Sequence, residues 1–124
     1  MEKNSKLIAV FDDDQDLLNI FRFLFEDEGF EVQTFQNCDQ VVEKVNAISP
    51  DLILMDNWIP STGGEFAVQQ LKSHADLKNI PVIYVSANND VKEIAARAGA
   101  DRFLAKPFEF DDLLALTNEL LHLK

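Results

Sequence analysis

The sequence has one cysteine, few basic residues and no long apolar run, and each shortage narrows what the protein can be. The single cysteine, Cys38, allows no internal disulfide, which fits a reducing compartment. Lysine and arginine total 11 against 22 acidic residues, and a net charge of −11 repels nucleic acids and anionic membrane surfaces. The first apolar run, residues 7–11, is too short for a signal peptide or a membrane span. We therefore expect a soluble, cytoplasmic protein that binds neither nucleic acid nor membranes directly.

The length and composition indicate one folded domain. The chain has 124 residues, 47% hydrophobic and 27% charged, which is typical of globular proteins rather than disordered ones. A domain of ordinary size fills a chain of this length, so we expect a single unit over residues 1–124 with no output domain. The sequence leaves open whether this unit acts alone or belongs to a larger protein.

Apolar runs of strand length alternate with apolar positions at helical spacing. The runs predict five strands, over residues 7–11, 30–35, 52–55, 81–85 and 102–105. The helical spacing predicts five helices, over residues 17–25, 41–48, 66–71, 91–98 and 111–123. Strands that alternate with helices pair in parallel, with helices on both faces of the sheet. We predict an α/β fold of flavodoxin-like order 2-1-3-4-5, with the second, half-polar strand at an edge.

The strands end at acidic, hydroxyl and ammonium groups. The first strand ends at the acids 12–14, the third at Asp56, the fourth at Ser86 and the fifth at Lys106. In open parallel sheets, ligands bind beyond the carboxyl ends of the strands, where the strand order reverses. The predicted order makes the first and third strands neighbours. The carboxylates should therefore converge on one edge of the sheet, with the hydroxyl and the ammonium group nearby.

Converging carboxylates repel one another unless a cation joins them, and this points to a metal site. Mg²⁺ fits because it accepts carboxylate, carbonyl and water oxygens. A carboxylate at Asp56, next to such an ion and flanked by Ser86 and Lys106, could attack a phosphoryl group while the cations neutralise its oxygens.

Each of these residues also has an ordinary structural interpretation. An Asp after a strand is usually a helix N-cap, and Asp14 or Asp16 fits that role. A Lys-Pro pair is usually a turn, and a Ser after a strand usually bonds to nearby backbone. The functional interpretation rests on the coincidence of all four strand ends on one predicted edge.

Four stretches of the sequence resemble those of a receiver domain of a two-component response regulator of the chemotaxis-regulator type. Residues 8–18 are similar to the first strand and acidic pair of that family, and residues 50–56 to its phosphoacceptor strand. Residues 82–87 resemble its fourth strand, and residues 103–108 its fifth. The four stretches together, in this order and at these spacings, are specific. The resemblance implies a signalling switch in a phosphorelay rather than an enzyme acting on other substrates, one that catalyses only its own phosphotransfer and dephosphorylation.

The resemblance also implies roles for the acidic residues. Asp56 would accept a phosphoryl group from a phosphohistidine on a sensor histidine kinase or a histidine phosphotransfer protein, forming an aspartyl phosphate. Asp13 would bind Mg²⁺ directly and Asp12 through water, with Asp56 and the backbone carbonyl of Trp58 as further ligands. No other cofactor is implied.

Other roles implied by the resemblance fall on the fourth and fifth strands. Ser86 would hydrogen-bond one phosphoryl oxygen and Lys106 would pair with another. The peptide bond between Lys106 and Pro107 would be cis. Phe103 matches an aromatic residue that changes position on phosphorylation, and a downstream protein would read that change.

Two apolar surfaces are candidates for partners. Ile20 and Phe23 lie off the main apolar stripe of the first helix, which in receivers faces the phosphodonor. Leu116 and Leu123 lie off the inner stripe of the last helix, on a face that receivers use for homodimers or targets.

The chain departs from the common pattern at Phe11, where a small aliphatic residue usually precedes the acidic pair.

Three other functions fit the sequence less well. A phosphatase of the haloacid dehalogenase type needs a second Asp two residues after the first, where this chain has Trp58, and it needs length for a cap. A flavin-binding electron carrier needs a loop rich in Ser, Thr and Gly after the first strand, where this chain has the acids 12–14. A degenerate receiver used as a scaffold would not need the complete set of acids, hydroxyl and lysine.

Overall fold

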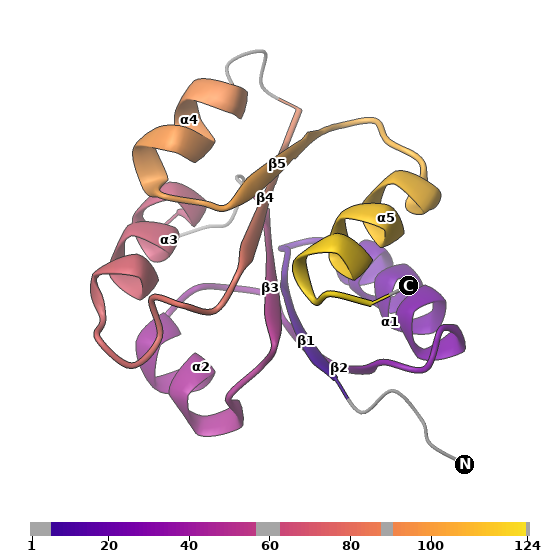
Figure 1. Cartoon of the computed structure of the whole chain (residues 1–124), viewed down its shortest axis with the longest axis horizontal. Helices are drawn as coiled ribbons and strands as arrows, with labels where there is room; N and C mark the ends of the chain where they lie inside the picture. The colour runs from indigo at the N-terminus through magenta and orange to yellow at the C-terminus, as the bar shows by residue number, and fades with distance from the viewer. Residues whose placement is uncertain (1–5, 57–62, 88–90, 124) are drawn as a thin grey trace.

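The computed structural model describes residues 6–56, 63–87 and 91–123, and it contains the ten predicted elements in the predicted order. The strands are β1 (Leu7–Phe11), β2 (Glu31–Phe35), β3 (Leu52–Asp56), β4 (Val82–Ser86) and β5 (Arg102–Ala105). The helices are α1 (Gln15–Asp27), α2 (Val41–Ile48), α3 (Gly64–Ser73), α4 (Val91–Ala98) and α5 (Phe110–Leu120). Figure 1 shows the sheet in the middle, with α1 and α5 on one face and α2, α3 and α4 on the other.

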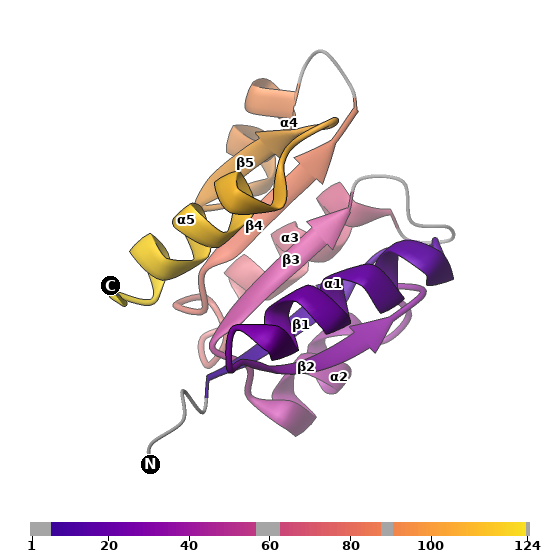
Figure 2. The ribbon, with the colours of Figure 1, turned by 90° about the vertical axis from the view of Figure 1, so that its right-hand side faces the viewer.

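The strand order is β2-β1-β3-β4-β5 and every neighbouring pair is parallel, which confirms the predicted topology. The register brings Phe11 level with both Phe35 and Met55, and Asp56 level with Val85. Because all strands run in one direction, their carboxyl ends lie at the same edge of the sheet (Figure 2). The strand order reverses between β1 and β3, because β2 follows β1 on one side whereas β3, β4 and β5 follow on the other.

The core consists of two apolar clusters, one on each face of the sheet. Successive side chains of a strand point to opposite faces, so Ile8 and Val10 join the cluster under α1 and α5, while Ala9 and Phe11 join the one under α2, α3 and α4. Every residue of β3 and β4 is buried, whereas β2 exposes Glu31 and Gln33. This difference confirms that the half-polar second strand lies at an edge.

Local polar groups set the ends of the first and last helices. The side chain of Asp14 accepts hydrogen bonds from the backbone N–H groups of Asp16 and Leu17, so α1 begins at Gln15, two residues before its apolar stripe. Asp14 is therefore an N-cap, as its ordinary interpretation suggested. Helix α5 ends at Leu120, earlier than the apolar pattern predicted. Within the described ranges, no helix has the length and apolarity needed to cross a membrane.

Candidate functional site

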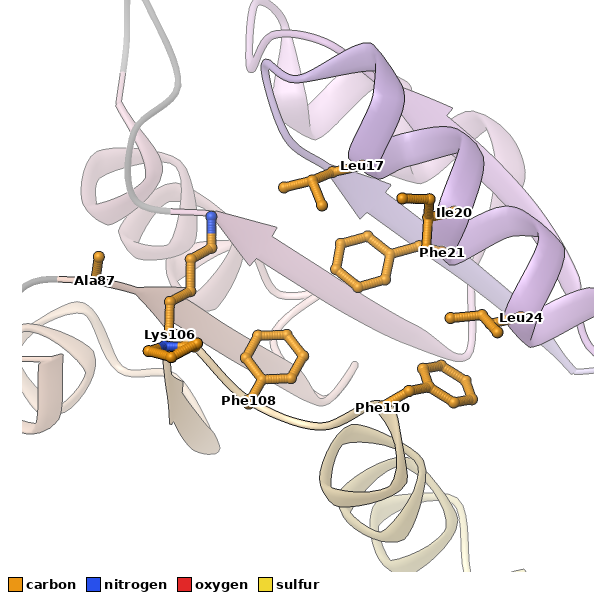
Figure 3. A pocket seen from close by; sticks show the side chains of 9 residues that line it. Leu17, Ile20, Phe21, Leu24, Ala87, Lys106, Phe108 and Phe110 are labelled. Atoms are coloured by element: carbon orange, nitrogen blue, oxygen red, sulfur yellow. The ribbon is translucent and has the colours of Figure 1, made fainter.

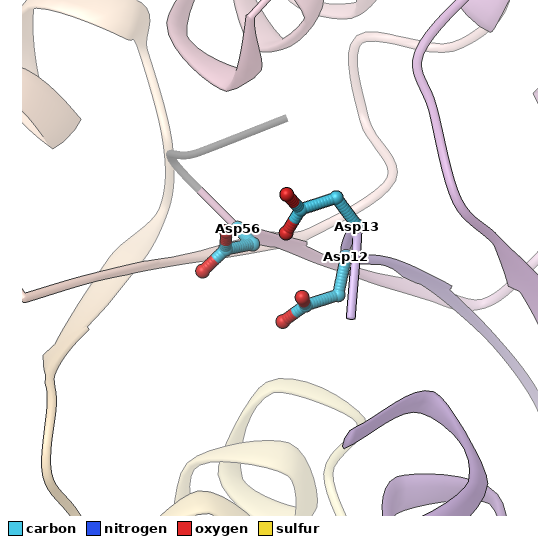
Figure 4. A group of neighbouring side chains, drawn as sticks. All are labelled: Asp12, Asp13 and Asp56. Atoms are coloured by element: carbon cyan, nitrogen blue, oxygen red, sulfur yellow. The ribbon is translucent and has the colours of Figure 1, made fainter. Parts of the chain in front are cut away.

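Three carboxyl groups from two strand ends meet at the edge where the chain order reverses. Asp12 and Asp13 directly follow β1, and Asp56 is the last residue of β3. One oxygen of each carboxyl group lies within 4.8 Å of one oxygen of the other two (Figure 4). Asp12 and Asp56 are each only 3% exposed, whereas Asp13 faces solvent. The strand register thus produces a cluster of acids that is buried on one side and open on the other.

Asp12 is held by two hydrogen bonds that fix its backbone and its side chain separately. Its N–H donates to the carbonyl oxygen of Phe35 at 3.1 Å, which carries the pairing of β1 and β2 one residue beyond the strands. Its Oδ1 accepts from the N–H of Asp14 at 2.9 Å. Since Asp14 caps α1, the acidic turn (residues 12–14) is attached both to β2 and to the first helix.

Lys106 supplies a positive charge to this cluster from the end of β5. Its Nζ lies 2.8 Å from Oδ1 of Asp56 and 3.9 Å from Oδ2 of Asp12. Its N–H donates to the carbonyl oxygen of Ser86 at 2.9 Å, which anchors the lysine to the neighbouring strand. The peptide bond between Lys106 and Pro107 is cis.

Ser86 and Phe103, which the sequence also indicated, lie on β4 and β5. Ser86 is fully buried at the end of β4, level with Ala105 and thus next to the strand end that carries Lys106. Phe103 lies on the edge strand β5, level with Tyr84, and is 40% exposed. It is not part of the charged cluster. Trp58 lies outside the described residues.

The electrostatics of the site follow from burial and from the excess of acids. Burial raises the pKa of Asp12 to about 6, with the charges of Asp56 and Asp13 adding to the rise and the Asp14 hydrogen bond and Lys106 opposing it. For Lys106, burial alone would lower the pKa, but the hydrogen bond and charge of Asp56 and the charges of the other two acids outweigh it and raise the pKa. The lysine therefore keeps its proton at neutral pH.

The donor set fits a hard divalent cation. Three carboxyl groups face one ammonium group, so the cluster carries surplus negative charge that a cation would neutralise. All of the donor atoms are oxygens, which Mg²⁺ prefers, and the exposed side at Asp13 leaves room for the waters that Mg²⁺ usually keeps. Asp12, Asp13 and Asp56 are the residues that could hold the ion.

An apolar cleft opens beside the acids, between α1 and the segment that joins β5 to α5. Lys106 lines the cleft (Figure 3). It also pairs with Asp56, so the cleft adjoins the acidic cluster. The apolar lining of the cleft is Leu17, Ile20, Phe21, Leu24, Ala87, Pro107, Phe108 and Phe110. Ile20 is 50% exposed, and Phe23 on the same helix is 69% exposed. The apolar pattern of α1 predicts the exposed Ile20 and Phe23, but the contribution of Phe108 and Phe110 has no signal in the sequence, since helical spacing does not indicate which other segment faces a helix.

Comparison with known proteins connects this arrangement to one family. The family model described as the response regulator receiver domain matches residues 8–118. The chain is 29% identical over 116 residues to the phosphate regulon transcriptional regulatory protein PhoB of Rhizobium meliloti, covering 92% of this chain and 51% of that protein. It is 31% identical over 115 residues to the CAI-1 autoinducer sensor kinase/phosphatase CqsS of Vibrio cholerae, covering 90% of this chain and 17% of that protein.

Solved structures share the fold as well. The receiver domain of the sensor histidine kinase PA1611 from Pseudomonas aeruginosa, solved with a magnesium ion coordinated in its active site cleft, superposes with a TM-score of 0.87 at 23% identity. That match covers 96% of this chain and 99% of the other. The chain spans about half the length, or less, of the curated relatives it matches.

Proposed function

This chain belongs to the response regulator receiver domain family, and from that premise we propose that it accepts a phosphoryl group on Asp56 from a phosphohistidine partner. The observation that carries the proposal is the position of Asp56, buried at the end of a central strand between two further acids and the Lys106 ammonium group. The unit over residues 1–124 would then be a signalling switch that catalyses only its own phosphotransfer and dephosphorylation.

Each side chain has a defined part in the proposed transfer. A carboxylate oxygen of Asp56 forms a bond to phosphorus while the bond from phosphorus to the imidazole nitrogen breaks and the imidazole leaves. The ammonium group of Lys106, which lies 2.8 Å from Asp56, pairs with a phosphoryl oxygen. Ser86, buried beside Lys106, donates its hydroxyl hydrogen to another. Phe103, partly exposed on β5, changes position on phosphorylation and alters the surface that a downstream protein reads.

We propose that Asp12, Asp13 and Asp56 hold the Mg²⁺ ion that this reaction needs, with the carbonyl group of Trp58 as a further ligand. When bound, the ion supplies positive charge that offsets the negative charge of the transferring group. The chain's own contribution is to gather three carboxyl groups within 4.8 Å of one another before any ion arrives. The Mg²⁺ in the PA1611 receiver domain, which has the same fold, supports this assignment.

The direct test is phosphorylation by a small donor. Incubation with Mg²⁺ and acetyl phosphate should add one phosphoryl group per chain, measured by mass spectrometry, and Asp56→Asn should add none. Asp51→Asn is a matched control, because Asp51 lies just before β3, at its opposite end, and its side chain accepts a hydrogen bond from the N–H of Leu7, far from the acidic cluster. Phosphorylation that persists in Asp56→Asn, or that disappears equally in Asp51→Asn, would refute the assignment.

The apolar cleft beside the site is the proposed docking surface for the phosphohistidine protein, a histidine kinase or a phosphotransfer protein. It adjoins Lys106 and includes the exposed Ile20, so a bound partner would present its histidine close to Asp56. Ile20→Ser should slow transfer from such a partner and leave phosphorylation by acetyl phosphate unchanged. Equal slowing of both reactions would mean that Ile20 acts on the chemistry and not on docking.

Two finer expectations are also proposals. Leu116 lines a second groove with Phe103 and Arg102 of β5, so the last helix is a candidate surface for a homodimer. The molecular mass in solution, measured with beryllofluoride as a mimic of the phosphoryl group, tests this. We also propose a cytoplasmic location, in keeping with a single buried cysteine.

A further inference from the structure

An aromatic pair closes the ends of β1 and β2, directly before the acidic turn at residues 12–14. Phe11, the last residue of β1, and Phe35, the last residue of β2, are level in the sheet, and their rings stack with centroids 4.8 Å apart and planes 19° from parallel. Phe11 is fully buried. The ammonium group of Lys44 lies over the Phe35 ring, 5.6 Å from its centroid, and donates to Oδ1 of Asn37 at 2.8 Å.

The aromatic pair sits at the point where the acidic turn is attached to the sheet. The residue after Phe11 is Asp12, and its N–H donates to the carbonyl oxygen of Phe35, the residue whose ring is stacked. This is the last hydrogen bond between β1 and β2, and β2 is an edge strand with one neighbour. Terminal bonds of edge strands open most easily, so the stack of two rings lies where it can keep this bond closed.

The acidic turn needs such an attachment because its charges repel. Asp12, Asp13 and Asp56 have oxygens within 4.8 Å of one another, and two of the three are buried. Without a cation, repulsion favours conformations in which Asp12 and Asp13 move away from Asp56. Any population in such open conformations lowers the apparent affinity for an ion, because the ion must first restore the closed arrangement.

We infer that the Phe11–Phe35 pair is a positioning element of the metal site, which keeps the backbone at Asp12 closed before Mg²⁺ binds. The inference rests on the proposed function in one respect, the assignment of the three acids as Mg²⁺ ligands. It concerns residues that touch neither ion nor phosphoryl group, so Phe11 and Phe35 act through Asp12.

The test compares the two ends of β2. Phe35→Leu removes the ring that stacks on Phe11, whereas Phe30→Leu removes a ring just before the other end of the strand, where Phe30 packs edge-on against Phe25 at 5.7 Å. Calorimetric titration with Mg²⁺ at neutral pH should give a dissociation constant about three- to tenfold weaker for Phe35→Leu, the range expected from loss of one aromatic pair. The constant should stay within about twofold of the wild type for Phe30→Leu and for the ring-retaining Phe35→Tyr.

A second readout needs no metal. Amide hydrogen exchange in the metal-free protein should be faster at Asp12 in Phe35→Leu than in Phe30→Leu or Phe35→Tyr, because the bond to the Phe35 carbonyl opens more often. If Phe35→Leu does not fold, Phe35→Met replaces it, since it also lacks the ring.

Three outcomes would overturn the inference. Equal Mg²⁺ affinity in Phe35→Leu and Phe30→Leu would reduce the pair to ordinary packing. Faster exchange at Asp12 with unchanged affinity would mean that the attachment does not position the ligands. A wild type that binds no Mg²⁺ would remove both the metal assignment and this inference, whereas failure of the inference alone would appear only in the variants.

Discussion

Two partly buried lysines pair with aspartates at opposite ends of the sheet, and the two pairs differ in the number of acids around the lysine. At the carboxyl end, Lys106 lies 2.8 Å from Asp56, and two further acids crowd the pair. At the amino end, Lys72 lies 2.7 Å from Asp101 and also donates to the carbonyl oxygens of Lys78 and Ile80. Asp101 in turn accepts from the N–H of Val82.

The amino-end pair is balanced and the carboxyl-end pair is not. One carboxylate and two carbonyl oxygens use the three donors of Lys72, so this pair joins α3 to the starts of β4 and β5 as a structural connection. At the other end, three carboxyl groups face one ammonium group, and the surplus charge leaves a place for a cation. The same two residue types therefore form a structural connection at one end and, under the proposed function, a reactive site at the other, and the balance of charges distinguishes the two.

The largest expected effect is loss of reaction rate when the carboxyl-end lysine is replaced. Lys106→Met removes the ammonium group proposed to pair with the phosphoryl oxygen, so phosphorylation by acetyl phosphate should slow by about 100-fold. The rate of mass gain at saturating Mg²⁺ measures it. A rate within a few-fold of the wild type would mean that Lys106 only balances charge in the resting protein.

Replacement of the amino-end lysine should have the opposite pattern. Lys72→Met leaves the carbonyl oxygens of Lys78 and Ile80 without this donor and removes the positive charge beside Asp101, so the free energy of unfolding should fall by about 1–3 kcal/mol. Urea denaturation measures this loss. The phosphorylation rate of the folded variant should match that of the wild type, and a slower rate would break the proposed division between the two ends.

Burial of Asp12, reinforced by the neighbouring acids, should also make stability depend on pH. The pKa of Asp12 is raised from 3.8 to about 6, so its contribution to stability is present below about pH 4 and is lost as pH rises through about 6. In metal-free buffer, Asp12→Asn should therefore raise the free energy of unfolding by about 1–3 kcal/mol near pH 8 and by little near pH 3.5. Denaturation at the two pH values tests this. An equal effect at both would show that burial of the charge is not the cause.

The smallest effect should come from an ion pair on the surface. Arg97 of α4 makes two hydrogen bonds to Glu65 of α3, and these lower the pKa of Glu65, but the arginine side chain is largely exposed. Arg97→Met should change the free energy of unfolding by less than about 1 kcal/mol at neutral pH. The contribution of the pair should vanish as acid protonates Glu65. A loss as large as that in Lys72→Met would show that burial does not separate the two kinds of pair.

Much of the fold could be predicted because it depends on local patterns. Five apolar runs alternating with helical spacing predicted the elements and the order β2-β1-β3-β4-β5. The ends of elements were less predictable, since the Asp14 cap begins α1 before its first apolar residue. The cleft between α1 and the β5–α5 segment, and the stack of Phe11 on Phe35, join residues far apart in the chain and had no pattern of their own in the sequence.

The sequence by itself determined that acids, a hydroxyl and a lysine end the first, third, fourth and fifth strands, because the direction of a strand and the spacing of its apolar residues depend only on local sequence. Only the tertiary structure decided which charges balance. Its place after the fifth strand singled out Lys106, but no local feature shows whether its ion pair or that of Lys72 is the balanced one. That difference depends on how many acids and carbonyl groups converge around each ammonium group, and convergence arises only when distant strands and helices pack together.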